Sequence, residues 1–161
     1  MLLKPELASE FLSKYKVILT HINSGQPPSD IKEYVSARSK LYDDSACFSS
    51  ALTKAAEIDF VEPLKSAVQG EFVYLKKYKS GYVFKKLDTG VFYQATALTS
   101  PLENLVHDYS IIKTALLPFS NQLVCDGLIS GVNNLIGKNF AKEVREAYWE
   151  AKKSGQVVLH V

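Results

Sequence analysis

Hydrophobic residues in the first seventy positions recur at the spacing of an α-helix. Steps of three and four residues place one set on a single helical face: Leu7, Phe11, Tyr15, Ile18 and Ile22. The Gly-Gln-Pro-Pro sequence at 25–28 ends this helix, because proline cannot continue one. The same spacing predicts helices over 31–42 and 45–56, each preceded by an aspartate that can cap it, and a short helix that begins at Pro63.

After Gly70 the hydrophobic period drops to two, which is typical of β-strands. Alternation assigns one face of the first strand to Phe72, Tyr74, Lys76 and Tyr78, and the other face to Val73, Leu75 and Lys77. Turn sequences at 79–81 and 88–90 then predict a three-stranded meander over 72–98. A second hairpin is predicted from strands over 110–117 and 122–129.

Two more helices are predicted in the second half of the chain. The Ser-Pro-Leu-Glu sequence at 100–103 has the pattern of a helix start, in which serine caps, proline opens the first turn and glutamate reaches back. It predicts a short helix over 101–106. A final helix over 139–153 would turn five residues toward the core: Phe140, Val144, Ala147, Tyr148 and Ala151. Residues 156–161 are predicted to form an edge strand.

The order of these elements predicts an α+β fold, because helices come first and an antiparallel sheet follows instead of alternating with them. We expect residues 1–69 to form a helical segment. Residues 70–161 would form a curved or barrel-like sheet of five to six strands closed by the C-terminal helix, and the two parts would make one compact unit. The length of 161 residues suits such a unit.

Composition excludes several classes of protein. Hydrophobic residues make up 47% of the chain and the net charge is only +2, which argues against disorder. The sequence holds no apolar run long enough to span a bilayer, and Lys4, Glu6 and Glu10 interrupt any secretory leader. Two widely separated cysteines do not form a disulfide framework. We therefore expect a cytoplasmic protein that does not associate with membranes.

Positive charge is concentrated in the first predicted hairpin. Residues 71–90 contain five lysines against Glu71 and Asp88, a local net charge of +3, while the rest of the chain is close to neutral. Interleaved lysines and aromatic rings can bind single-stranded nucleic acid, with candidate residues Lys76, Lys77, Lys85, Lys86, Tyr74 and Tyr82. The alternative is structural: lysines protect exposed strands from edge-to-edge pairing, and aromatic residues of a sheet usually belong to the core.

A second candidate site is a pocket around Cys125, Asp126 and His107. These residues could supply a thiol nucleophile, an orienting carboxylate and a base. Cys125 lies in the middle of an apolar strand, however, where a buried structural thiol is the simpler interpretation. Asp126 would then accept backbone N–H groups near Gly127. The three histidines are too widely spaced for a metal site, and no cofactor signature is present, so we predict no metal and no cofactor.

The second hairpin carries a weak family resemblance. The residues Leu117-Pro118-Phe119 and Asp126-Gly127-Leu128, followed by a charged helix, resemble a hairpin found in uncharacterised bacterial proteins. The similarity covers residues 111–153. It implies a hairpin followed by a helix and no known activity.

Trp149 is the last candidate, as an anchor for a partner. It lies beside Arg145, Lys152 and Lys153, off the apolar stripe of the final helix, where it could anchor a protein partner or a second copy of the chain; packing at a domain seam is the alternative. No group of residues demands catalysis. We therefore favour a non-catalytic intracellular domain that binds a protein or a small ligand, with nucleic-acid binding and an enzyme using the Cys125 pocket as the alternatives.

Overall fold

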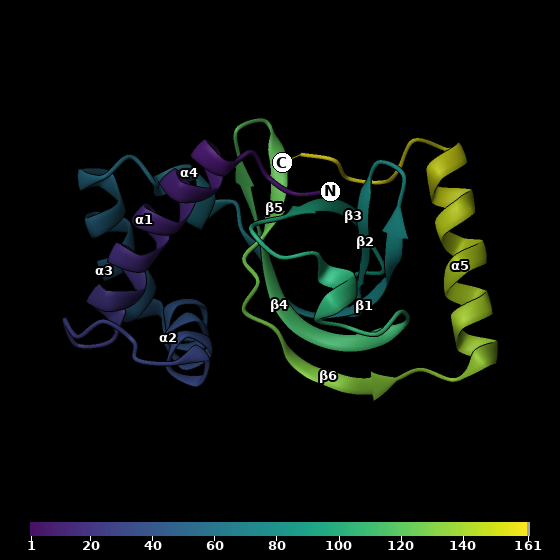
Figure 1. Ribbon diagram of the computed structural model, residues 1–161, viewed down its shortest axis with the longest axis horizontal. Coiled ribbons are helices and arrows are strands. Elements are labelled where there is room, and N and C mark those ends of the chain that lie inside the picture. The colour runs from purple at the N-terminus through teal and green to yellow at the C-terminus, as the bar shows by residue number, and fades with distance from the viewer. Residues whose placement is uncertain (161) are drawn as a thin grey trace. The chain divides into compact units, whose positions relative to one another are not determined.

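The computed structural model describes residues 1–160, apart from the side chains of residues 132 and 133, and divides the chain into two compact units. Lys4–Ala67 form a helical unit, and Met1–Leu3 belong with the chain from Val68 onward. The predicted fold class is confirmed. The protein is α+β, with N-terminal helices, a largely antiparallel sheet closed into a barrel, and a C-terminal helix (Figure 1).

The helical unit consists of four helices packed on one apolar core. They are α1 (Pro5–Ile22), α2 (Ile31–Asp43), α3 (Ser45–Glu57) and the short α4 (Val61–Lys65). The predicted stripe of α1 is buried, and Phe11 packs edge-on against Phe60 at 5.5 Å between ring centroids. Leu41 and Ala51 complete this core from α2 and α3.

Both predicted aspartate caps are present in the helical unit. Asp30 accepts a hydrogen bond from the backbone N–H of Glu33 at 2.9 Å, and Asp44 accepts from Ala46 and Cys47 at 2.9 and 3.1 Å. These bonds satisfy N–H groups that have no partner within the first turn of a helix. The sequence thus places the starts of α2 and α3 correctly.

The second unit is built on a five-stranded barrel with a sixth strand at its edge. Its strands are β1 (Val68–Tyr78), β2 (Gly81–Lys86), β3 (Phe92–Ala97), β4 (Ser110–Phe119), β5 (Gln122–Cys125) and β6 (Ser130–Leu135). They lie in the order β1-β2-β3-β5-β4-β6, and an additional pairing of β1 with β4 closes the barrel. The β3–β5 pair is parallel, whereas the other strand pairs of the sheet are antiparallel.

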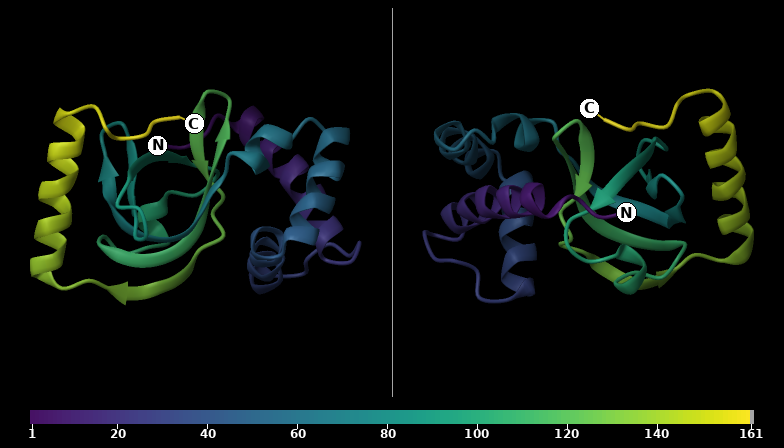
Figure 2. Two further views of the ribbon diagram at one scale, coloured as in Figure 1. Left: turned by 180° about the vertical axis from the view of Figure 1, so that it is seen from behind. Right: turned by 45° about the horizontal axis from the view of Figure 1, so that its top comes forward.

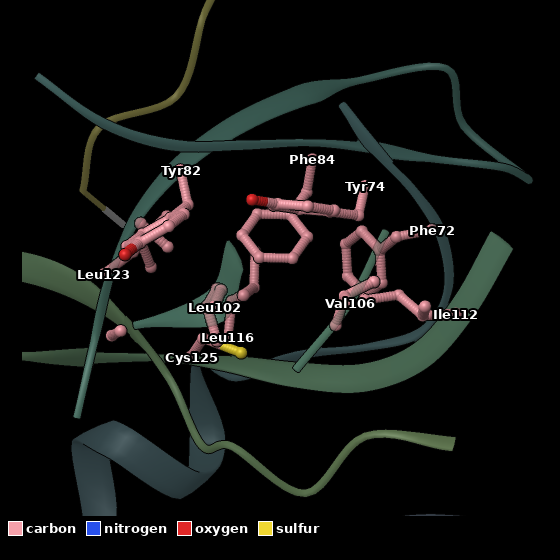
Figure 3. Packing of buried hydrophobic residues seen from close by; sticks show 12 residues of the cluster. Phe72, Tyr74, Tyr82, Phe84, Leu102, Val106, Ile112, Leu116, Leu123 and Cys125 are labelled. Carbon is pink, nitrogen blue, oxygen red and sulfur yellow. The ribbon is translucent and has the colours of Figure 1, made fainter. Parts of the chain in front are cut away.

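The barrel interior is filled by aromatic and aliphatic side chains (Figure 3). The rings of Phe72, Tyr74, Tyr82 and Phe84 point into it from β1 and β2, and all four are fully buried. The 3₁₀-helix η1 (Leu102–Asn104) and the loop after it add Leu102 and Val106 to the same cluster. The described side chains of the interior therefore form a packed core.

The helix α5 (Lys138–Lys153) covers the outer face of β1, β2 and β3 (Figures 1 and 2). Val144 and Tyr148 of α5 pack there against an apolar cluster contributed by the strands: Val73, Leu75, Val83 and Phe92. The burial of Val144 and Tyr148 confirms the predicted stripe in part. Phe140 was predicted to face the core, but it lies in the first turn of α5 and is 39% exposed.

The alternation predicted for β1 is wrong beyond Leu75. The register against β2 shifts between Tyr74 and Lys77, which marks a β-bulge. An extra residue in one strand reverses which side chains face each side. Tyr78 therefore packs with the outer cluster, and Lys77 stands opposite Tyr82 on the inner side.

The start pattern at Ser100 does not produce the predicted helix over 101–106. Residues 102–104 form only the single 3₁₀ turn η1, and no side chain caps it. Glu103 bonds instead to Lys77 and Tyr82 of the barrel. Tertiary partners thus replace the local capping interaction that the sequence predicts.

The strand that follows Cys125 differs from the prediction as well. β5 ends at Cys125, four residues earlier than expected, and Gly127 adopts a φ of 75°. The chain then forms β6 on the free edge of β4, a polar strand that the hydrophobic pattern does not reveal. Residues 156–160 make one parallel bridge, between Val158 and Tyr93, instead of a strand, and residue 161 of the predicted edge strand lies outside the described residues.

Candidate functional site

The two tyrosines proposed to stack on bases lie inside the barrel. Tyr74 and Tyr82 are both 0% exposed, and their rings pack on each other at 6.4 Å between centroids. A base cannot reach either ring without opening the barrel. Burial also raises the pKa of Tyr74 well above its ordinary value.

The four candidate lysines do not share a face. Lys77 and Lys86 stand at opposite ends of the β1–β2 hairpin, and each is held by a carboxylate: Glu103 at 2.9 Å and Asp88 at 2.8 Å. Lys76 and Lys85 lie over aromatic rings, with their ammonium groups 5.3 Å from the Tyr78 ring centroid and 5.6 Å from that of Phe92. The positive charge of the hairpin is thus partly neutralised and divided between surfaces.

Glu103 connects one of these lysines to a buried hydroxyl. The Tyr82 hydroxyl donates to the Glu103 carboxylate at 2.5 Å, and the Lys77 ammonium donates to its other oxygen. These two bonds, with Lys77 the stronger influence, lower the pKa of Glu103 to about 2. Burial and the bond to Glu103 raise the pKa of Tyr82 to about 12. This cluster fixes η1 on the barrel.

The proposed catalytic group is not assembled around Cys125. The thiol is fully buried in the barrel core, with its sulfur 3.6 Å from the hydroxyl oxygen of Thr114, whereas His107 is exposed on the loop before β4. Asp126 accepts hydrogen bonds from the Thr114 hydroxyl at 3.2 Å and from the backbone N–H of Leu128 at 3.0 Å. The bond from Leu128 confirms the prediction that Asp126 binds backbone near Gly127.

Trp149 lies on α5, where an aromatic cluster holds it against the barrel unit. Its ring meets that of Tyr78 at 90° and 6.0 Å, and that of Tyr148 at 5.4 Å. Tyr148 in turn contacts Tyr78 at 4.8 Å and Phe92 at 5.8 Å. Trp149 is thus packed against two rings while 42% of it stays exposed.

Cationic side chains surround the exposed part of this cluster. The ammonium of Lys152 lies 5.1 Å from the Trp149 ring centroid, and Lys76 covers Tyr78. The Arg145 guanidinium is close enough to Tyr78 to oppose the rise that burial causes in the pKa of that tyrosine. We call these five residues, Trp149, Tyr78, Lys76, Arg145 and Lys152, the Trp149 surface.

Glutamates lie on the other side of Trp149. A depression of about 530 Å³ lies beside the ring and is lined by Glu143, Glu146, Ala147 and Glu150. Two of these carboxylates are paired with lysines of the same helix, Glu146 with Lys142 at 3.9 Å and Glu150 with Lys153 at 3.5 Å. The indole therefore stands between cationic side chains and a flank of mixed charge. Such an arrangement offers an apolar anchor with complementary charges of both signs around it.

The Trp149 surface joins two features that the sequence shows only separately. The basic, aromatic hairpin and the tryptophan of the last helix are more than sixty residues apart in the chain. Alternation along β1 predicts Tyr78 on the same face as Phe72 and Tyr74, so the sequence does not indicate it as a site residue. The bulge turns its ring to the outer face. A glycine or proline at the bulge would have marked it in the sequence, but the residues there are Leu75 and Lys76.

The described residues contain neither a metal site nor a membrane span. Within the described part of the chain, no three His, Cys, Asp or Glu residues are grouped so that they could hold a metal ion. Among the same residues, no helix has the length and apolar character needed to cross a membrane.

The strand order defines the architecture of this unit. A closed barrel ordered β1-β2-β3-β5-β4, with a parallel β3–β5 pair and a long β1 that pairs with both β2 and β4, has the topology of an OB barrel. Here the outer face of β2 and β3 is covered by the chain's own C-terminal helix. No protein-family model, curated protein or solved structure matches the chain.

Proposed function

We propose that the protein is a non-catalytic binding domain that engages a protein partner through the Trp149 surface. The observation that carries this proposal is a tryptophan ring that packs on Tyr78 and Tyr148 and is still 42% exposed. An aromatic side chain already held by its neighbours loses less conformational entropy on binding, and tryptophan is enriched among the residues that dominate interface energies. The Trp149 ring therefore has the properties of an interface anchor before any partner arrives.

The charges around Trp149 favour a protein over a nucleic acid. A nucleic acid would bring phosphates to Lys76, Arg145 and Lys152, but beside the indole it would also meet the carboxylates of Glu146 and Glu150, each paired with a lysine. Protein interfaces surround an apolar centre with a polar rim of mixed charge. The mixed charge of α5 supports a partner that presents both acidic and basic side chains around an apolar pocket.

The fold supports the same choice. OB barrels bind oligonucleotides and oligosaccharides through the face of strands 2 and 3 and the adjoining loops. In this protein Val83 and Phe92 occupy that face and pack against Val144 and Tyr148 of α5. Fold alone does not imply function, and the covered face removes the argument for nucleic-acid binding by analogy.

We also expect the protein to work in the cytoplasm. Cys47 and Cys125 are both free thiols, which is the usual state in a reducing compartment.

Site-specific cross-linking and affinity measurement together test the proposal. A photo-reactive amino acid replaces Glu146, beside Trp149, and in a control protein it replaces the exposed Lys40 of α2. A protein captured only from position 146 is then purified and titrated by calorimetry. We expect Trp149→Ala to weaken its binding by about thirtyfold, which corresponds to about 2 kcal/mol and is typical of an interface anchor.

Phe140→Ala is the matched control, because Phe140 is an aromatic residue of the same helix with a similar exposure of 39%. It should change the affinity by less than about threefold. Equal losses in the two variants would contradict the proposal, as would the absence of a cross-link specific to position 146.

A second experiment tests the nucleic-acid alternative. Tight binding of a fluorescent oligo(dT) that depends on Trp149 would favour that alternative over a protein partner.

A further inference from the structure

A groove in the helical unit forms a second candidate site, independent of the Trp149 surface. It has a volume of about 520 Å³ and runs along α1, between the loop that leads into α2 and the side chain of Lys54 on α3. Its volume lies within the range of about 300–1,000 Å³ that is usual for small-molecule sites. All the residues that line it belong to Lys4–Ala67.

The floor of the groove is apolar. Val17 and Pro27 are exposed on it, and Tyr34 of α2 contributes a half-buried ring. Val17 is 37% exposed, although it lies in the middle of a helix beside a well-packed core. An apolar body placed on this floor would remove Val17 and Pro27 from water.

The groove is preformed by the loop at residues 23–27. The side-chain amide of Asn23 donates to the carbonyl oxygen of Gln26 at 2.9 Å, and the backbone N–H of Gln26 donates to the carbonyl of Asn23 at 3.1 Å. Gly25 adopts a φ of 78°, which side chains rarely allow. These constraints hold Pro27 in place, so a ligand would not have to order the loop.

The rim of the groove is basic. The basic side chains that line it are Lys16, Lys54 and His21, and no carboxylate is among the described residues of its lining. Lys54 also contacts Glu57 at 3.0 Å, and the Nε2 atom of His21 lies 2.7 Å from the hydroxyl oxygen of Ser50. An anion at the rim would therefore meet the ammonium group of Lys16 and, in competition with Glu57, that of Lys54.

We propose that this groove binds a small amphipathic carboxylate, an aliphatic or aromatic body that carries one anionic head. The apolar floor at Val17, Pro27 and Tyr34 takes the body, and the ammonium groups of Lys16 and Lys54 take the carboxylate. A neutral ligand of the same length would use only the floor, and a short carboxylate only the rim. A ligand that combines an apolar body with an anionic head should therefore bind more tightly than a ligand with either part alone. An apolar depression without the basic rim would not show this preference.

Titration with three simple probes, followed by two-dimensional NMR of the full chain, tests the inference. The probes are octanoate below its micellar concentration, 1-octanol, which lacks the charge, and acetate, which lacks the apolar body. We expect saturable shifts from octanoate at Val17, His21 and Tyr34. Octanol should bind about fivefold more weakly, and acetate should not saturate. Equal affinity for octanoate and octanol, or octanoate shifts spread over both units, would overturn the proposal.

Charge reversal separates the rim from the floor. Lys16→Glu combined with Lys54→Glu should weaken octanoate roughly tenfold and leave octanol unchanged, since only the head contacts the rim. Lys65→Glu, an exposed lysine outside the groove, is the matched control and should have no effect. Val17→Asp should weaken both probes by placing a charge on the floor. Unchanged octanoate binding in the double variant would refute the site. Trp149→Ala, which lies outside the groove, should leave octanoate binding unchanged.

Discussion

Trp149 and Tyr78 form an edge-to-face pair, with ring centroids 6.0 Å apart and ring planes at 90°. The pair links α5 to the end of β1, at the point where the bulge has turned Tyr78 to the outer face. It is therefore both the support of the proposed binding surface and one of the contacts that hold α5 over β1, β2 and β3.

The Tyr78–Trp149 pair should have a measurable coupling energy. In a double-mutant cycle of Tyr78→Ala and Trp149→Ala, we expect about 0.5–1.5 kcal/mol of coupling, the range of aromatic pairs in proteins. Urea unfolding followed by far-ultraviolet circular dichroism measures it without using tryptophan fluorescence. Trp149→Ala combined with Tyr93→Ala is the control, because Tyr93 packs with Phe72 inside the barrel unit. That control pair should be additive within about 0.5 kcal/mol. Coupling of zero between Tyr78 and Trp149 would show that the two rings do not support each other.

Regular elements of this fold could be predicted from the sequence because their signals are local. The apolar stripes of α1 and α5 and the aspartate caps of α2 and α3 depend on residues within a few positions of one another. The alternation of β1 is equally local as far as Leu75. Beyond that point a bulge, which depends on pairing with β2, decides which side chains face outward.

The candidate site could be predicted only in fragments, because its geometry depends on long-range contacts. The position of Trp149 off the helical stripe marks it as a candidate. For Tyr78, however, alternation along β1 predicts the strand face that carries Phe72 and Tyr74. Glu103 was expected to cap a helix, and it bonds to Lys77 and Tyr82 instead. The edge strand β6 has no hydrophobic pattern and forms because β4 offers an unpaired edge.

Glu103 should contribute to stability in a pH-dependent way. Its pKa is lowered in the folded protein from an ordinary value of 4.5 to about 2. Stability from a lowered carboxyl pKa is fully present above the unfolded pKa and is lost as the pH falls through the folded one. We expect the stability difference between wild type and Glu103→Gln to be at most about 1 kcal/mol at pH 7, because the carboxylate is partly exposed to solvent. It should shrink toward zero between about pH 4.5 and 2.

Urea unfolding at a series of pH values measures this difference. Glu146→Gln is the control, because Glu146 is an exposed glutamate, and substitutions of exposed residues usually change stability by less than about 0.5 kcal/mol. A constant difference between wild type and Glu103→Gln across the acid range would contradict the assignment.

Tyr82 should contribute to the loss of stability at the alkaline end. Burial and the bond to Glu103 raise its pKa from 10 to about 12, so its neutral form is favoured in the folded protein. This contribution is complete below pH 10 and is lost as the pH rises toward 12. Tyr82→Phe should therefore lose less stability than wild type between those pH values. Thermal unfolding at pH 8, 10 and 11 tests the prediction, and parallel curves for the two proteins would count against it.

The two cysteines should differ sharply in reactivity. Cys125 is fully buried in the barrel core, whereas Cys47 is partly exposed on α3. Iodoacetamide in native buffer should modify Cys47 first and reach Cys125 only when the barrel opens. Mass spectrometry of a time course measures the two rates. Modification of Cys125 as fast as Cys47 would revive the thiol-nucleophile alternative, because it would mean that the core thiol is accessible.

Asp126 should act on stability, because its carboxylate binds buried donors on the barrel. Asp126→Ala removes the acceptor for the Thr114 hydroxyl and the Leu128 N–H, and an unsatisfied buried donor costs about 1–3 kcal/mol. We expect Asp126→Ala to lose about 2–3 kcal/mol and Asp126→Asn to lose less, since the amide oxygen can still accept. Asp108→Ala, an exposed carboxylate before β4, should stay within about 0.5 kcal/mol of wild type. Urea unfolding ranks the three variants. If Asp126→Ala proved as stable as wild type, the carboxylate would not be needed by these donors, and a ligand-binding role for Asp126 would become the better interpretation.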